Sequence, residues 1–519
     1  MTRPNVLFII TDQHRADHVG FGGNDVVRTP NLDALAERSV VFDRAYVANP
    51  ICAPNRSTIV TGRYPSAHGV VFNDRSLPLG GNTWPRVFRR AGYRTGLIGK
   101  AHLMMWRSAA RFDHGPGDAA VFDPSPPGWD RHETASLYAD GRPEPPDDFY
   151  GFDEVQLALG HGASVAGHHL HWAIDRGIDP ATIEGATLVD GPAEYRSARW
   201  AQILKPAYGA EHHSTEFVTD RTIDFIERHD GERPWLAYAS FPDPHHPFAP
   251  PGDWFDRHRQ TDMVLPPTFH DDLDGAPGFL TAIAGRPGEP AIVTPWRPTE
   301  EQFRELLAAQ YGAIEMIDAG VGRILAAVEA LGQRDDTIVV FTSDHGDMMG
   351  DHGLLLKGMQ HWEGTTRVPY VIDSPTNDAA RTSSLASSVD LGQTLLDLAG
   401  LEPYRNMQGS SLVPILDDPS TSVRDHVLIE EEAPAVMGGR GRRRVGIPAR
   451  ARTVVTDTMR FTRYSTGESQ LFDLSDDPLE LHDRSAGDRR RVGELTTLLV
   501  DTMMAVATPA PAGADPDAG

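Results

Sequence analysis

The stretch Val6-Leu7-Phe8-Ile9-Ile10-Thr11-Asp12 is an unbroken apolar run that ends in a carboxylate. Because polar residues do not alternate with apolar ones, the run predicts a strand buried on both faces, as in a parallel sheet. Thr337-Ile338-Val339-Val340-Phe341 repeats the pattern and leads into Ser343-Asp344-His345. Open α/β sheets bind ligands at the carboxyl ends of their strands, so both aspartates are candidate ligands. The alternative role for each is a helix cap.

Helix-like and strand-like segments alternate between and beside these two runs. Helices are predicted at 29–38, 84–91, 216–228, 300–331 and 387–399, and further strands at 40–42, 94–98 and 235–241. Such alternation, with polar residues at the strand ends, predicts an α/β doubly wound sheet.

The pattern changes after about residue 406. Short strands are predicted at 427–429, 453–455, 461–464 and 470–473, followed by a helix at 491–506. We therefore expect a catalytic domain at 1–406, a smaller α+β C-terminal subdomain at 407–508 and a disordered tail at 509–519. Within the first domain, weak periodicity predicts insertions at about 106–213 and 252–297. The histidines of the first insertion lack partners with metal-ligand spacing and are assigned to a surface loop: His161, His168, His169 and His171.

Composition excludes several classes of protein. The net charge of −25 argues against binding to nucleic acid or anionic membranes, since phosphate surfaces demand a basic face. The run Arg440-Gly441-Arg442-Arg443-Arg444 is the local exception, and we interpret it as a solvated loop or a subunit contact rather than an anion site. No apolar run approaches the length of a membrane span, and the N-terminal run is too short for a signal peptide. A cytoplasmic protein is the simplest expectation.

Cys52 is the only cysteine among 519 residues, which excludes disulfides and thiolate metal clusters. In the motif Cys52-Ala53-Pro54-Asn55-Arg56, the proline suits the first turn of a helix, and Gly62 can end that helix. Cys52 would then lie at a helix N-terminus with Arg56 one turn along, where a nucleophile could meet an anionic substrate. The alternative is a small apolar residue of the core.

Other polar side chains also follow predicted strands. Asp12, Asp344 and His345 suit a divalent cation, and Gln13 could add an amide oxygen. Cations and proton donors are supplied at three further places: Lys100 and His102 after the strand at 94–98, His245 and His246 after the strand at 235–241, and Lys357, for which a surface lysine is the alternative.

Taken in order, these segments resemble the sulfatase family of the alkaline phosphatase superfamily. The matching pieces are residues 5–13, 52–56 with 61–63, 99–102, 245–247, 343–347 with 350–353, Lys357, Glu363, 367–369, 470–474 and 477–478. The resemblance covers nearly the whole chain apart from the two insertions and the tail. It implies an alkaline-phosphatase-like α/β fold with a large mixed, mostly parallel sheet flanked by helices.

The resemblance also implies a mechanism. The family's cysteine is oxidised after synthesis to formylglycine, which requires a formylglycine-generating maturation enzyme as a partner. One hydroxyl of the hydrated aldehyde would attack the sulfur of a sulfate ester, and the other would expel sulfate by re-forming the aldehyde. One divalent metal ion would be held by Asp12, Gln13, residue 52, Asp344 and His345.

Further roles follow by position in the family pattern. Arg56 would hold the formylglycine, and Lys100 and Lys357 would bind sulfate oxygens. His245 with Lys357 would protonate the leaving oxygen, while His102 would assist breakdown of the covalent intermediate. His246 is the adjacent alternative to His245. Asn73 would contact the substrate or serve only a turn.

Two departures from the common family pattern leave alternatives open. Asp12-Gln13 and Asp344-His345 replace an Asp-Asp pair and an Asp-Asn pair, and resemble bacterial choline sulfatases and phosphonate monoester hydrolases. The metal is therefore expected to be Ca²⁺ or Mn²⁺ rather than Mg²⁺, with the histidine favouring Mn²⁺. The leading hypothesis is a sulfate monoester hydrolase active on aryl sulfates. A phosphonate monoester or phosphodiester hydrolase, and a catalytically silent binding protein, are the alternatives, and a homodimer or higher homo-oligomer is compatible with the family.

Overall fold

The computed structural model describes residues 3–105, 128–139, 141–183, 192–228, 231–292, 294–433 and 448–507. The predicted disordered tail and the arginine run at 440–444 lie outside these ranges. Within them, none of the helices combines the length and the apolar character that crossing a membrane requires.

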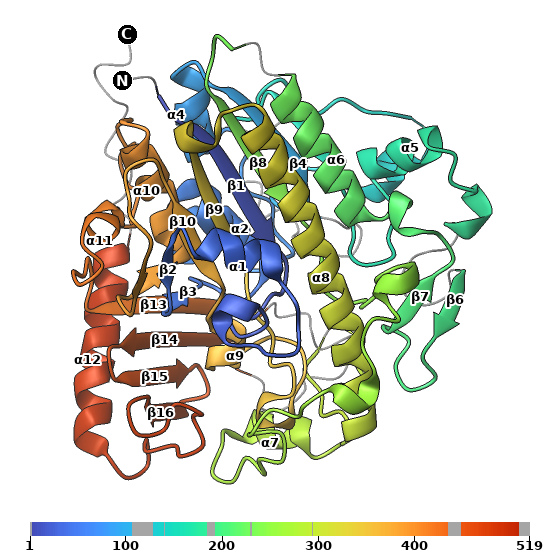
Figure 1. The fold of residues 1–519 in the computed structure, drawn as a ribbon. Helices are drawn as coiled ribbons and strands as arrows, with labels where there is room; N and C mark the ends of the chain where they lie inside the picture. The colour runs from blue at the N-terminus through green and yellow to red at the C-terminus, as the bar shows by residue number, and fades with distance from the viewer. Residues whose placement is uncertain are drawn as a thin grey trace.

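An eight-stranded sheet forms the centre of the molecule (Figure 1). β1 (Asn5–Thr11) lies between β9 (Thr337–Ser343) and β8 (Trp235–Ser240) and is parallel to both. Its residues are buried throughout, because neighbouring strands and both layers of helices cover it. In register, Thr11 lies opposite Ser343, so the residues that follow, Asp12 and Asp344, leave the sheet side by side.

Five further strands complete the sheet. On one side of the central three lie β4 (Arg94–Gly99) and β5 (Glu154–Leu157), both parallel; on the other lie β10 (Tyr370–Asp373), which is antiparallel to β9, then β2 (Val40–Phe42) and β11 (Ala380–Thr382). The predicted mixed, mostly parallel sheet is therefore confirmed. Sequence periodicity missed β5, since this four-residue edge strand lies in a region assigned to loops.

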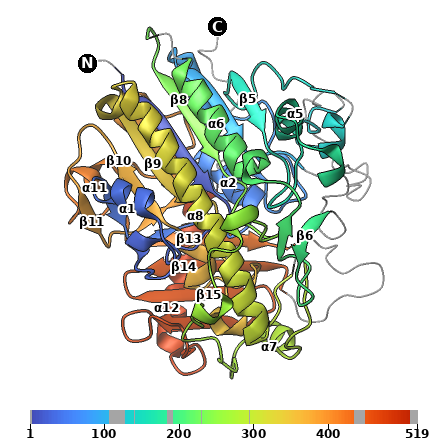
Figure 2. The same ribbon diagram turned by 45° about the vertical axis from the view of Figure 1, so that its right-hand side comes forward.

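Helices cover both faces of the sheet (Figures 1 and 2). Leu7 and Ile9 of β1 pack in one cluster with α1 (Pro30–Ala36), α6 (Ser214–Glu227) and α8 (Glu300–Ala330). The alternate residues Val6, Phe8 and Ile10 pack in another with α2 (Cys52–Thr61), α4 (Trp84–Arg90) and α10 (Leu391–Leu398). This division follows from the period of two along a strand.

A second, antiparallel sheet lies next to the first and belongs to the C-terminal part of the chain (Figure 1). Its strands run in the order β13 (His426–Glu432), β14 (Arg450–Thr456), β15 (Met459–Tyr464) and β16 (Ser469–Asp473). α12 (Arg489–Val506) packs on it through Leu495 and Leu499. The predicted α+β character of this part is confirmed.

The remaining elements are short. They are α3 (Pro65–His68), α5 (His168–Asp175), α7 (Gly278–Ala284), α9 (Glu363–Thr366), α11 (Val413–Asp417), β3 (Ala45–Tyr46), β6 (Ala193–Arg196), β7 (Leu204–Pro206) and β12 (Ala386–Ser387). α5, β6 and β7 lie in the range 106–213, so this range carries regular structure in addition to loops.

Candidate active site

Cys52 is the first residue of α2, as its motif predicts. Gly62 ends the helix with φ +58°, a conformation that favours glycine. The side chain of Ile51 does not cap the helix; instead, the Asn73 side-chain oxygen accepts a hydrogen bond from Ala53 N at 3.0 Å. Asn73 therefore holds the helix end that carries Cys52, a role that sequence alone did not suggest.

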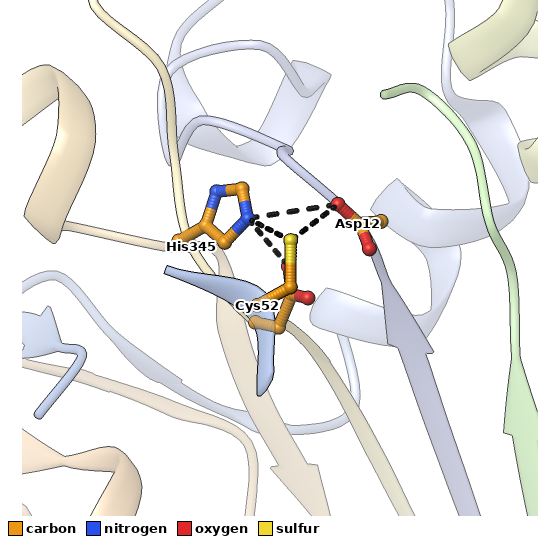
Figure 3. A group of neighbouring side chains, drawn as sticks. Asp12, Cys52 and His345 are labelled. Carbon is orange, nitrogen blue, oxygen red and sulfur yellow. Dashed lines mark hydrogen bonds and ion pairs between the residues drawn. The ribbon is translucent and has the colours of Figure 1, made fainter. Parts of the chain in front are cut away.

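Three side chains converge around Cys52, so that the cluster has four members. Cys52 Sγ lies 3.1 Å from His345 Nε2 and 3.8 Å from Asp12 Oδ1 (Figure 3). His345 Nε2 lies 3.6 Å from both Asp12 Oδ1 and Asp344 Oδ1. All four are buried. The carboxylates come from the ends of β1 and β9, and the thiol comes from the end of α2, so segments far apart in sequence build the cluster.

The donor set of this cluster fits a divalent cation. His345 Nδ1 donates to its neighbour's carbonyl, Gly346 O, at 2.8 Å, which leaves Nε2 unprotonated and facing the two aspartates. Burial holds the pKa of His345 well below its usual value, and the nearby Lys357 cation adds to this effect. A neutral imidazole nitrogen and two carboxylate oxygens are ligands suited to such an ion.

Arg56 balances the charge of the two carboxylates. Its Nε donates to Asp344 Oδ2 at 2.6 Å and one terminal nitrogen donates to Asp12 Oδ2 at 3.2 Å; the other contacts Lys100 O and Ser240 Oγ. Burial raises the pKa of Asp344, whereas the pKa of Asp12 is held low despite its burial because Lys100 and Arg56 lie beside it. The guanidinium thus fixes the carboxylates.

The thiol itself is not activated. Burial raises the pKa of Cys52 to about 11, and the neighbouring Asp12 carboxylate adds to the shift. Arg56 is paired with the two aspartates, so burial and Asp12 outweigh any effect of its charge on the thiol. A protonated thiol agrees with a residue that serves as a precursor.

Lys100 and His102 follow β4 at the same edge of the sheet. The Lys100 ammonium is fully buried and donates to Asp12 Oδ2. His102 adopts a left-handed backbone conformation (φ +52°), and burial and the Lys100 charge hold its pKa well below the usual value. Its turn is held by Glu133, a buried carboxylate that accepts the backbone N–H groups of His102, Leu103 and Met104.

Lys357 and His245 contact each other at the same site. Lys357 Nζ lies 2.9 Å from His245 Nε2 and donates to the Gln13 side-chain oxygen at 2.6 Å. Gln13, predicted as a metal ligand, therefore directs its oxygen to Lys357. His245 Nε2 also lies 3.9 Å from Asp12 Oδ1, whereas His246 Nδ1 contacts Gln13 Nε2 at 3.2 Å. Of the two adjacent histidines, it is His245 that faces the lysine and the carboxylate.

His161 is the residue that sequence reasoning missed. It was assigned to a surface loop, and this assignment is wrong: its side chain is 13% exposed, and Nε2 lies 2.7 Å from Lys100 Nζ. Its ring stacks on that of His245 at a centroid distance of 3.7 Å. A usable signal was the flanking pair Gly160 and Gly162, which permits a tight turn around His161.

Lysine content offered a second signal. The sequence has only three lysines, at positions 100, 205 and 357, within a total of 48 Lys and Arg residues. Two of the three lie at this site. A compact ammonium is thus rare in this chain and is concentrated at the cluster, whereas arginine serves most of the other positive positions.

Several known proteins resemble this chain in sequence and in fold. The sequence model of the family described as Sulfatase matches residues 4–401, and the model described as N-sulphoglucosamine sulphohydrolase, C-terminal, matches residues 350–507. An arylsulfatase of Clostridium perfringens is 29% identical over 511 residues, which cover 96% of this chain and 94% of that protein. A choline-sulfatase of Rhizobium meliloti is 27% identical, with 95% and 85% covered. The crystal structure of the phosphonate monoester hydrolase of Agrobacterium radiobacter superposes with a TM-score of 0.75 at 26% identity and covers 97% of this chain and 95% of that chain.

Proposed function

Because this chain belongs to the sulfatase family and is a sulfuric ester hydrolase, we propose that it cleaves sulfate monoesters, with aryl sulfates as assay substrates, at the cluster around Cys52. One observation carries the proposal: the thiol of Cys52 contacts a metal-ligand set, and two buried or partly buried lysines contact Asp12 and Gln13 of the same set. Such a site can bind a compact anion on one side and activate a nucleophile on the other.

We assign the metal to Asp12, Asp344 and His345, together with residue 52 and, after rotation of its amide, Gln13. A divalent cation there would supply charge that acidifies a hydroxyl on residue 52 and offsets charge on a sulfate oxygen. Two carboxylates with one imidazole suit Ca²⁺ or Mn²⁺. Elemental analysis of the purified enzyme identifies the ion, and a chelator should abolish activity.

Residue 52 acts in its oxidised form under this proposal. Hydrated formylglycine would supply two geminal hydroxyls, one to attack sulfur and one to expel sulfate as the aldehyde re-forms. The raised pKa of the Cys52 thiol supports a precursor role, since a thiol of pKa about 11 is a poor nucleophile near neutral pH. Mass spectrometry of the peptide that contains residue 52 measures the conversion, and only unmodified thiol after co-expression with a maturation enzyme would contradict it.

Under this proposal, the chain's own side chains bind the sulfate ester and protonate its leaving oxygen. Lys100 and Lys357 donate to sulfate oxygens, and Arg56 keeps the two aspartates charged and in place. Lys357 donates to His245 Nε2, so this pair can pass a proton to the leaving oxygen. His102, two residues after Lys100, takes up or returns a proton when the covalent intermediate breaks down.

The second candidate function is hydrolysis of phosphonate monoesters or phosphodiesters at the same site. The superposition with a phosphonate monoester hydrolase supports it, as do the Asp12-Gln13 and Asp344-His345 pairs. The test compares kcat/KM for a nitrophenyl sulfate and for the nitrophenyl monoester of phenylphosphonate on one matured preparation. We expect the sulfate to be preferred; a large preference for the phosphonate would reverse the order of the two proposals.

A further inference from the structure

His161 lies in a loop that follows β5 and is fixed tightly in place. Gly160 and Gly162 on either side have φ of +88° and +52°. A Cβ atom at Gly162 would lie 2.1 Å from Pro247 O, so this loop packs directly on the turn that carries His245. The position of His161 is therefore set by backbone contacts.

The contact with Lys100 defines the protonation of the ring. A lysine ammonium can only donate, so His161 Nε2 must accept its hydrogen bond, and the proton of the neutral ring resides on Nδ1. Lys100 Nζ is thus held between two acceptors, Asp12 Oδ2 and His161 Nε2. A long lysine side chain loses considerable rotamer entropy when fixed, and two acceptors define its position better than one.

The stack with His245 defines the second contact. The two rings are nearly parallel, with an interplanar angle of 13°. Lys357 donates to His245 Nε2, so the Nδ1 proton of His245 is donated to the carbonyl oxygen of His246. His161 covers one face of this ring and limits its rotation.

Asp12, His161 and His245 also approach one another closely enough to hold a cation. The Lys100 ammonium contacts Asp12 and His161, so the chain itself already supplies a positive charge there.

We propose that His161 is a positioning residue of the anion site, which is the sulfate-binding site formed by Lys100 and Lys357. Its Nε2 places the Lys100 ammonium, and its ring face fixes the plane of His245. The proposal rests on the proposed function, because it assigns His161 to the binding and protonation of the same sulfate ester. His161 acts through Lys100 and His245.

Two substitutions separate the two contacts. His161→Phe keeps a ring against His245 but loses the acceptor for Lys100, whereas His161→Gln keeps an acceptor and loses the stack. Loss of an outer partner of this kind typically costs about 10–100-fold. We expect His161→Phe to lower kcat/KM by that amount for all aryl sulfates alike. His161→Gln should instead lower kcat increasingly as the leaving phenol becomes less acidic, since protonation by His245 then matters more.

Controls address folding and the metal site. His171→Gln on α5 alters a histidine that contacts Gly141 O on the outside of the same region and should leave kinetics unchanged. Metal content and melting temperature should match the wild type in all variants. The proposal is overturned if both His161 variants have wild-type kinetics. It is also overturned if both variants lose activity with the same dependence on the leaving group.

Binding of inorganic sulfate, measured by calorimetry, tests the Lys100 contact without turnover. His161→Phe should bind sulfate about 10-fold more weakly than wild type and than His161→Gln. Equal binding by all three proteins overturns the Lys100 contact even if no substrate is known. If the wild type hydrolyses no sulfate ester but still binds sulfate more tightly than His161→Phe, the proposed function is wrong. The placement of Lys100 by His161 would still hold.

Discussion

Two buried arginines, Arg56 in α2 and Arg460 in β15, are each held between two carboxylates. Arg56 contacts Asp12 and Asp344 at the edge of the main sheet; Arg460 contacts Glu363 and Glu480 where the C-terminal sheet meets the rest of the molecule. Each cluster holds one carboxyl group with a raised pKa, Asp344 and Glu480, because burial dominates there. In each the second carboxyl group has a lowered pKa despite burial, because the arginine and other cations lie beside it.

The clusters differ in what surrounds the arginine. Around Arg460 the remaining contacts are structural: Tyr46 donates to Glu363 at 2.8 Å, and Arg460 donates to Thr366 Oγ1 at 3.0 Å. Around Arg56 a thiol and the unprotonated nitrogen of His345 converge on the same carboxylates, and Lys100 adds an ammonium. In both places, a buried arginine thus bridges two acidic residues and holds separate segments of the chain together. Only the cluster around Arg56 also contains metal-ligand atoms and a nucleophile precursor, so only that cluster is a candidate active site.

Replacement of Cys52 by alanine should produce the largest effect and affect only one of the two clusters. Removal of a catalytic nucleophile lowers kcat on the order of 10⁵–10⁶-fold. Arg56 keeps both partners in this variant, so the melting temperature should change by only a few degrees. The measurement is steady-state hydrolysis of an aryl sulfate by matured wild type and variant, and substantial activity in Cys52→Ala would place the nucleophile elsewhere.

Replacement of Arg460 by methionine should show the opposite pattern. It leaves Glu363 and Glu480 without their arginine, and breaking a buried ion pair in this way costs about 3–5 kcal/mol in the free energy of unfolding. Activity per folded molecule should persist. Urea unfolding measures the loss, and Arg463→Met on the same strand, which changes an exposed residue, should stay within about 0.5 kcal/mol of wild type. Equal losses in the free energy of unfolding in the two variants would mean that the ion pairs of Arg460 do not stabilise the fold.

The pH dependence of the reactivity of the unmatured Cys52 thiol tests the environment of the cluster around Arg56. A raised pKa means that Cys52 loses its proton only at higher pH, so the thiolate fraction near pH 8 should be roughly 100-fold below that of a thiol with an unshifted pKa. Alkylation of the only cysteine should therefore keep accelerating as pH rises from 7 to 9.5. Asp12→Asn should shift this rise to lower pH because it removes a negative charge beside the sulfur. A plateau near pH 9 in wild type would show that neither burial nor Asp12 raises the pKa of Cys52.

Replacement of Asn73 by alanine should have the smallest effect. It removes the acceptor for Ala53 N at the start of α2, and losing such a cap costs about 0.5–2 kcal/mol. Asn73→Asp keeps the acceptor and should restore stability, whereas its extra negative charge near the anion site should raise KM. Thermal unfolding and aryl sulfate kinetics together distinguish a cap from a substrate contact; a large rise in KM for Asn73→Ala with unchanged stability indicates the latter.

The sequence by itself determined the layered α/β fold, the two carboxylates at strand ends, the helix that begins at Cys52 and the family. These features depend on local patterns: apolar runs, a proline and a glycine at fixed offsets, and motifs a few residues long. β5 was missed because a four-residue strand at a sheet edge has little periodicity to detect.

Only the tertiary structure decided how these pieces act on one another. Asp12 and Asp344 are neighbours because β1 and β9 pair in parallel across more than half of the chain, and no local pattern encodes that register. The partners of Arg56, the raised pKa of Cys52, the choice of His245 over His246 and the entry of His161 into the site all depend on which side chains the fold places within a few ångströms. Hydrogen-bond direction and desolvation are properties of those contacts, so they exist only once the sheet has assembled.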